Sequence, residues 1–144
     1  MNGWRLSGIV LLVAMAALTV YGTWPNEYFW DNALWTGGYA ILALLGLMAL
    51  RTPADRFFGV AIAFAAFQVS VLYLIRTSTD HVALAVAIWH VMLLAPMVVG
   101  SIVASFFPAR QIPRPHWMAA GVSLAITIAP ALLLVALKFL ADPY

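Results

Sequence analysis

The stretch from Val82 to Phe107 constrains the fold more than any other part of the sequence. Its 26 residues include no Asp, Glu, Lys or Arg, and His90 is its one titratable side chain. As an α-helix rising about 1.5 Å per residue it would be roughly 39 Å long, more than the ~30 Å hydrocarbon layer of a bilayer. The stretch therefore predicts a helix that crosses a membrane.

Four further stretches are apolar, and each reaches or approaches the ~20 residues that a spanning helix needs. Unpaired backbone groups cost several kcal/mol each in hydrocarbon, and these stretches lack the alternation of barrel strands, so helix is the expected form. We expect an all-α integral membrane protein, a single domain over 1–144. Its bundle of five transmembrane helices would lie at about 6–23, 33–50, 57–75, 82–107 and 117–140.

Composition excludes several other classes of protein. The chain is 65% hydrophobic and 8% charged, whereas soluble domains carry about 25% charged residues. The absence of cysteine excludes disulfides and thiolate metal sites. A formal charge of +2 without a basic run gives no indication of nucleic-acid binding. The sequence requires no cofactor, and membrane lipid is its first expected partner.

The positive charges are distributed unevenly between the two sides of the predicted bundle. With the N-terminus in the cytoplasm, the inner side carries Arg5, Arg51, Arg56, Arg110 and Arg114, and the outer side carries Arg76 and Lys138. Because Lys and Arg concentrate in cytoplasmic loops, we expect the N-terminus in the cytoplasm and the C-terminus outside. The expected location is a bacterial-type inner membrane, where Arg51, Arg56, Arg110 and Arg114 would contact lipid phosphates.

Small residues recur at four-residue spacing on several predicted helices. The longest series is on the fifth helix, at Ala119, Ser123, Thr127 and Ala131, and the third helix carries Gly59 and Ala63. Small residues on one helix face let two backbones approach closely, which is how helices associate in lipid. We interpret these faces as packing seams, within the chain or with a protein partner or second copy.

His90 is the leading candidate for a functional side chain. A neutral imidazole has one donor and one acceptor, and both need partners at membrane depth. One interpretation makes His90 a ligand to a metal, haem or pigment, or a proton relay. The other makes it a structural residue bonded to another helix, through Ser123, Thr127 or Gln68. We add the neighbouring Trp89 and the mid-helix Gln68 to a candidate ligand site.

The connection between the first two predicted helices is rich in aromatic residues, among them Trp30 and Trp35. Such rings are typical of the headgroup region, and they could also form a lid or platform for a flat ligand, so Trp30 and Trp35 complete the candidate ligand site. Acidic residues and a histidine fall on the same predicted side. A weak metal or acid–base site there would use Glu27, Asp31, Asp80 and His81.

These patterns favour a non-catalytic function. We expect an accessory or structural subunit of a larger membrane complex, or a bundle that binds an apolar ligand such as a lipid, quinone or pigment. One alternative is a small oligomeric transporter or channel, with a path lined by Gln68, His90, Pro96 and Pro130, since broken helices can mark transport sites. Another is a membrane enzyme that uses His90 or the outer acid and histidine group.

Overall fold

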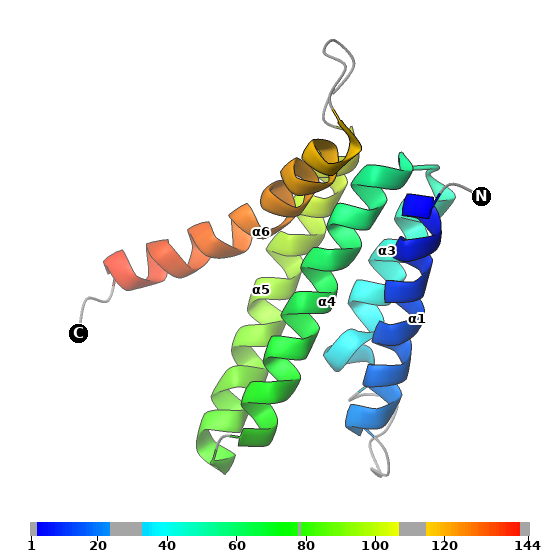
Figure 1. The fold of residues 1–144 in the computed structure, drawn as a ribbon. Coiled ribbons are helices and arrows are strands. Elements are labelled where there is room, and N and C mark those ends of the chain that lie inside the picture. The colour runs from blue at the N-terminus through cyan, green and yellow to red at the C-terminus, as the bar shows by residue number, and fades with distance from the viewer. Residues whose placement is uncertain (1–2, 24–32, 78, 107–114, 142–144) are drawn as a thin grey trace.

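The computed structural model describes residues 3–23, 33–77, 79–106 and 115–141, without the side chains of 80 and 82–84. Every regular element in these ranges is helical (Figure 1). The elements are α1 (Gly3–Thr23), the π-helical turn η1 (Leu34–Gly38), α3 (Tyr39–Ala49), α4 (Ala54–Thr77), α5 (Asp80–Phe106) and α6 (His116–Ala141).

Four of the described helices are long and apolar enough to cross a membrane: α1, α4, the 85–106 part of α5, and α6. The all-helical fold is therefore confirmed, and these lengths and compositions indicate a membrane protein. The second predicted span coincides with η1 and α3, which form one apolar helix over Leu34–Ala49. At about 1.5 Å per residue its 16 residues extend roughly 24 Å, less than the ~30 Å of a bilayer core.

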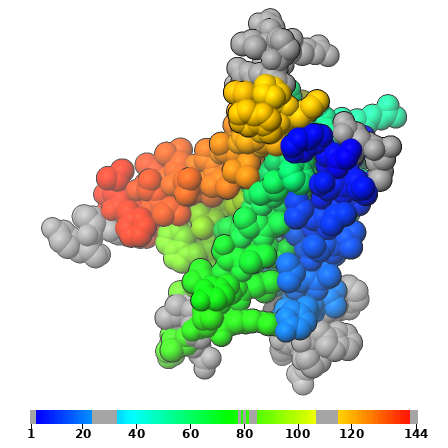
Figure 2. All heavy atoms as spheres, in the orientation of Figure 1, coloured from blue at the N-terminus to red at the C-terminus, as the bar shows by residue number. Residues whose placement is uncertain are grey.

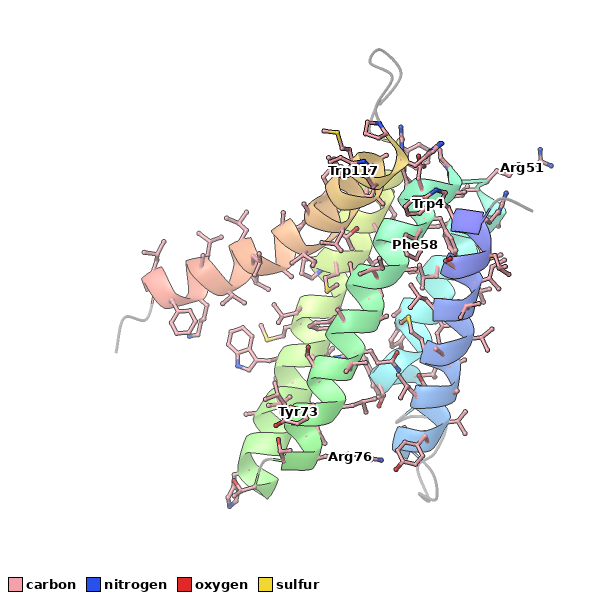
Figure 3. The ribbon with its side chains drawn as sticks, in the orientation of Figure 1. Trp4, Arg51, Phe58, Tyr73, Arg76 and Trp117 are labelled. Atoms are coloured by element: carbon pink, nitrogen blue, oxygen red, sulfur yellow. The ribbon has the colours of Figure 1, made fainter. Side chains whose placement is uncertain are left out.

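The helices α1, α3, α4 and α5 lie side by side, and α1 packs mainly along α4 (Figure 1). Two ends of this bundle can be followed in Figure 3. We call one the Trp4 end, where Trp4, Arg51, Phe58 and Trp117 are found, and the other the Arg76 end, where Tyr73 and Arg76 are found. Arg51 and Arg76 thus lie at opposite ends, as the alternation of the predicted helices requires.

Large apolar side chains fill the space between these helices. Met15, Leu44 and Phe64 are completely buried, and Phe57 and Met97 are 2% exposed. They come from α1, α3, α4 and α5, so the core holds four helices together. Much of the remaining apolar surface faces outward, as expected of helices whose surroundings are lipid.

The helix α6 crosses α4 and α5 through small residues. A Cβ added to Gly59 of α4 would collide with the Ala120 carbonyl oxygen, and one on Gly100 of α5 would lie 2.6 Å from the carbonyl oxygen of Ile126. Backbones can approach this closely only where a side chain is missing. The predicted seam on α6 is buried at Ser123, Thr127 and Ala131, but at its start Ala120 is buried rather than Ala119.

The second half of α6 diverges from the bundle. Its C-terminal end projects away from the other helices (Figures 1 and 2), and Leu133, Leu137 and Phe139 are more than half exposed. The helix α6 crosses its neighbours obliquely, and its close contacts with α4 and α5 lie in its first half.

The link from α3 to α4 is a Schellman-type turn. The amide of Thr52 donates to the carbonyl of Leu47 at 3.1 Å, and the amide of Arg51 donates to the carbonyl of Met48 at 3.0 Å. Arg51 takes a φ of 55°, the left-handed conformation that usually selects glycine. The amide of Phe57 then donates to the Pro53 carbonyl, so α4 starts directly after the turn.

Candidate functional site

The turn η1 interrupts the α-helical hydrogen-bond pattern at Leu34–Gly38. In an α-helix the amide of Tyr39 would donate to the carbonyl of Trp35, four residues earlier. Here it donates to the carbonyl of Leu34, five residues earlier. The carbonyl of Trp35 therefore loses its α-helical donor and can accept a bond from another helix. Short π-helical segments are frequent at functional sites.

His90 of α5 supplies that donor. Its Nε2 lies 2.8 Å from the carbonyl oxygen of Trp35, and its ring stacks on Phe67 of α4 with a centroid distance of 5.0 Å and an interplanar angle of 8°. The side chain is 5% exposed. Two contacts from two different elements therefore hold the imidazole in one orientation. The prediction that His90 bonds to Ser123, Thr127 or Gln68 is therefore wrong.

The other ring nitrogen of His90, Nδ1, is buried and has no hydrogen-bond partner among the described residues. A buried polar atom without a partner costs roughly 1–3 kcal/mol, so most such atoms in native structures are satisfied. Among the described side chains of α5, His90 therefore carries the buried polar atom that lacks a partner.

A cavity of about 430 Å³ lies beside this histidine. Four elements line it: the end of α1, the start of η1, the last turns of α4 and the first half of α5. The described lining residues are Gly22, Thr23, Trp35, Thr36, Val71, Leu72, Ile75, Ala87, Ile88, His90 and Val91. Most of these are apolar, with a few polar groups among them, which is the usual lining of a small-molecule site.

Gln68 belongs to a separate polar cluster that faces α1. Its Nε2 donates to the Met15 carbonyl at 3.2 Å and to the Thr19 hydroxyl at 2.7 Å. The Thr19 hydroxyl in turn donates to the Met15 carbonyl at 2.8 Å. A Cβ on Gly37 would collide with Thr19 Oγ1 and lie 2.6 Å from Gln68 Nε2, so this glycine lets η1 approach both residues. The cluster ties α1, η1 and α4 together next to the cavity.

The structure brings together only part of the predicted site. Trp35 and His90 meet through a hydrogen bond and share the cavity wall. Trp89 precedes His90 on α5, is half-buried, and is not among the described residues that line the cavity. Trp30, Glu27 and Asp31 lie outside the described residues, as does the side chain of Asp80.

The prolines of the transport hypothesis do not line this cavity either. Pro96 and Pro130 are half-buried within α5 and α6. Pro130 removes the donor that would otherwise pair with the carbonyl of Ile126, and that carbonyl packs against Gly100 of α5. The proline of α6 therefore coincides with a close contact between two helices.

The structure describes two of the four arginines that we expect to contact lipid phosphate, Arg51 and Arg56. Arg56 donates from Nη1 to the carbonyl of Ser105 at 3.1 Å, close to the end of α5. A cation at a helix C-terminus is favoured by the helix dipole. Arg51 is exposed in the turn after α3, and Arg110 and Arg114 lie outside the described residues. His81 is exposed near the start of α5.

Within the described ranges, no group of three or more His, Cys, Asp or Glu side chains is placed to hold a metal ion. Comparisons with protein-family models, curated proteins and solved structures find no match for this chain. The geometry of the site is therefore the basis for assigning a function.

The sequence indicated His90 and Trp35 as candidate site residues but did not reveal the hydrogen bond that joins them. The bond uses a backbone carbonyl of η1, which no side-chain pattern reveals. The pair Gly37-Gly38 was the available signal, because adjacent glycines weaken a regular helix and permit close approach of backbones.

Proposed function

We propose that this protein is a non-catalytic membrane bundle that binds a small apolar ligand in the cavity between α1, η1, α4 and α5. The observation that carries the proposal is the cavity of about 430 Å³, whose wall includes a histidine held in place by the Trp35 carbonyl. Its volume is within the range of about 300–1,000 Å³ found for small-molecule sites.

The lining indicates the class of ligand. Val71, Leu72 and Ile75 of α4 and Ile88 and Val91 of α5 all line the cavity, so the body of the ligand would be apolar. A molecule of this kind partitions into the bilayer before it binds. Lipids, quinone-type molecules and pigments have this character, and the proposal keeps to that class.

The proposal can be tested with a substitution that fills part of the cavity. Ala87 is a small lining residue, so Ala87→Phe would occupy part of the cavity, while Ala125→Phe adds the same group at an exposed position of α6. A long-chain alcohol carrying a diazirine would be crosslinked to the purified protein in nanodiscs, and labelled peptides would be mapped by mass spectrometry. We expect the wild type and Ala125→Phe to be labelled on the cavity segments of α4 and α5, and Ala87→Phe to lose this labelling.

Equal labelling of Ala87→Phe and Ala125→Phe would contradict the proposal, as would labelling of the wild type spread evenly over the lipid-facing surface. Melting temperatures of the three proteins establish that each is folded during the measurement.

A second function, as an accessory subunit of a membrane complex, is favoured by the diverging half of α6. A groove of about 260 Å³ lies where α6 leaves α4 and α5, lined in part by Ala66, Met97 and Leu132. A protein partner inserted there would bury the exposed second half of α6. A photocrosslinking residue at Leu137, with one at Val13 of α1 as control, would give a discrete adduct at Leu137 alone; equal adducts at both positions, or none, would contradict this function.

We further propose five spans with the N-terminus in the cytoplasm of a bacterial-type inner membrane. The placement of Arg51 at one end and Arg76 at the other supports this arrangement. The chain has no cysteine, so Arg51→Cys and Thr77→Cys each provide a unique label. An impermeant thiol reagent applied to intact cells should modify the cysteine at 77 and not the one at 51; the reverse pattern would overturn the orientation.

A further inference from the structure

We propose that a groove between the ends of α1 and α4 binds an anionic phospholipid, whose phosphate lies against Arg76 and whose acyl chain lies in the groove. The groove has a volume of about 200 Å³. Its described lining residues are Leu18, Tyr21, Gly22, Val69, Leu72, Tyr73 and Arg76. We call it the α1–α4 groove. It is a second site, and the inference does not depend on the ligand proposed for the cavity beside His90.

The first observation is the positive charge at one end of the α1–α4 groove. Arg76 is exposed in the last turn of α4, and its side chain extends toward the end of α1 (Figure 3). Its Cζ lies 4.5 Å from the centroid of the Tyr21 ring. The ring attracts the cation without neutralising it. No carboxylate among the described residues forms an ion pair with Arg76, so its charge is available to an anion.

The second observation is that the groove is apolar beyond this end. The helices α1 and α4 both run toward the Arg76 end, so Leu18 and Val69 lie closer to the middle of the bundle than Arg76 does (Figure 1). Val69 precedes Arg76 by seven residues, which is about 10 Å along a helix. A phospholipid has the same order, with a charged phosphate at the membrane surface and hydrocarbon below it. The groove therefore matches a phospholipid in depth as well as in chemistry.

The third observation is that charge distinguishes this groove from the other two binding spaces. The described linings of the cavity beside His90 and of the groove beside α6 contain no Lys, Arg, Asp or Glu. The dipole of α4 favours a cation at its C-terminal end, but it does not account for a groove that begins at that cation.

The composition of the groove also indicates the kind of head group. Its described lining includes one guanidinium and two tyrosines, residues that are common at the headgroup level of a membrane. It includes no carboxylate that could pair with the ammonium of a zwitterionic lipid. The head group would therefore be net negative, as in phosphatidylglycerol.

The experiment measures lipid binding to the purified protein by native mass spectrometry. The protein would be delipidated in detergent and titrated with phosphatidylglycerol or with phosphatidylcholine of the same acyl chains. We expect one phosphatidylglycerol to bind roughly fivefold more tightly than phosphatidylcholine, which is the preference that one basic side chain near a membrane surface provides. Excess inorganic phosphate should not displace the lipid, because the acyl chain contributes to binding.

Two pairs of variants locate the site. Arg76→Gln should weaken the binding of phosphatidylglycerol about fivefold, whereas Arg51→Gln removes the same charge at the opposite end and should leave this site unchanged. Val69→Phe would fill part of the α1–α4 groove and should also weaken binding. Val99→Phe is its control, since Val99 is an exposed residue of α5 outside the described linings. Melting temperatures establish that each variant is folded.

Four results would overturn the assignment. Equal affinity for the two lipids would contradict an anionic head group. Equal losses in folded Arg76→Gln and Arg51→Gln would show that the preference comes from overall charge. Equal binding by Val69→Phe and Val99→Phe would place the acyl chain elsewhere. Displacement by inorganic phosphate would show a site for the anion alone. None of these results bears on the cavity beside His90, which the labelling of Ala87→Phe tests separately.

Discussion

The Trp4 end and the Arg76 end of the bundle are built from the same kind of apolar helix but are packed differently. At the Trp4 end, α6 lies directly on the backbone of α4 at Gly59. Polar groups there are paired across helices: His116 with Asp55 at 2.9 Å, and Arg56 with the Ser105 carbonyl at 3.1 Å. The rings of Trp4 and Phe58 also contact each other at this end, with a centroid distance of 5.2 Å.

Toward the Arg76 end, the helices leave a cavity of about 430 Å³ between them. Among the described residues, the buried His90 Nδ1 has no hydrogen-bond partner, and neither has Gln68 Oε1, which is nearer the middle of the bundle. The difference shows close backbone contacts between helices at one end and a cavity toward the other. The two kinds of packing can coexist because helices in lipid are held by local close contacts, rather than by a hydrophobic effect shared across the bundle.

The largest effect should come from breaking the contact at the Trp4 end. Gly59→Val would bring a side chain into the carbonyl of Ala120, so α6 would have to separate from α4. We expect a loss of about 3 kcal/mol or more in the free energy of unfolding, since backbone has little freedom to move away. Unfolding followed by circular dichroism in detergent would measure it.

Gly121→Ala is the matched control, because a Cβ on this glycine of α6 meets nothing within 4 Å. Equal stability of Gly59→Val and Gly121→Ala would show that α6 is not seated on α4, and the comparison of the two ends would lose its basis.

A change beside the cavity should have a smaller effect on stability, and it should also lower ligand labelling. Gly37→Ala would push its methyl group into the Thr19 hydroxyl and the amide of Gln68, which would displace η1. We expect a loss of about 1–3 kcal/mol in stability, the usual range for inserting a methyl group into a well-packed site. Ligand labelling should fall with it, because the carbonyl of Trp35 that orients His90 moves with η1.

Gly46→Ala in the same helix has open space around the added Cβ and should change neither quantity. If Gly37→Ala lost stability but kept full labelling, the cavity would not depend on η1.

The smallest expected effect is a gain in stability. Arg51 has a φ of 55°, which costs a non-glycine residue roughly 1–2 kcal/mol. Arg51→Gly should therefore stabilise the protein by up to about 1 kcal/mol, less the entropy that glycine adds to the unfolded chain. Ligand labelling should be unchanged, since the turn is at the Trp4 end. A destabilised Arg51→Gly, measured against Arg51→Ala, would show that the arginine side chain contributes more than its backbone strain costs.

The helical class and most helix positions could be predicted because they depend on local composition. The predicted second helix, 33–50, agrees with the described helix to within one residue at each end, although the π-turn within it was not foreseen. The oblique course of α6 was also missed. It depends on where Gly59 and Gly100 meet the partner backbone, and spacing along a single helix does not contain that information.

The sequence by itself determined that this chain forms apolar helices, because unpaired backbone groups in lipid leave no other form for stretches such as Val82–Phe107. It also marked His90 as a side chain needing partners at membrane depth. Only the tertiary structure decided that its partner is the backbone of Trp35 and that His90 contributes to the wall of a cavity. The physical reason is that a π-turn frees a carbonyl in space, and which side chain reaches it depends on how separate helices pack.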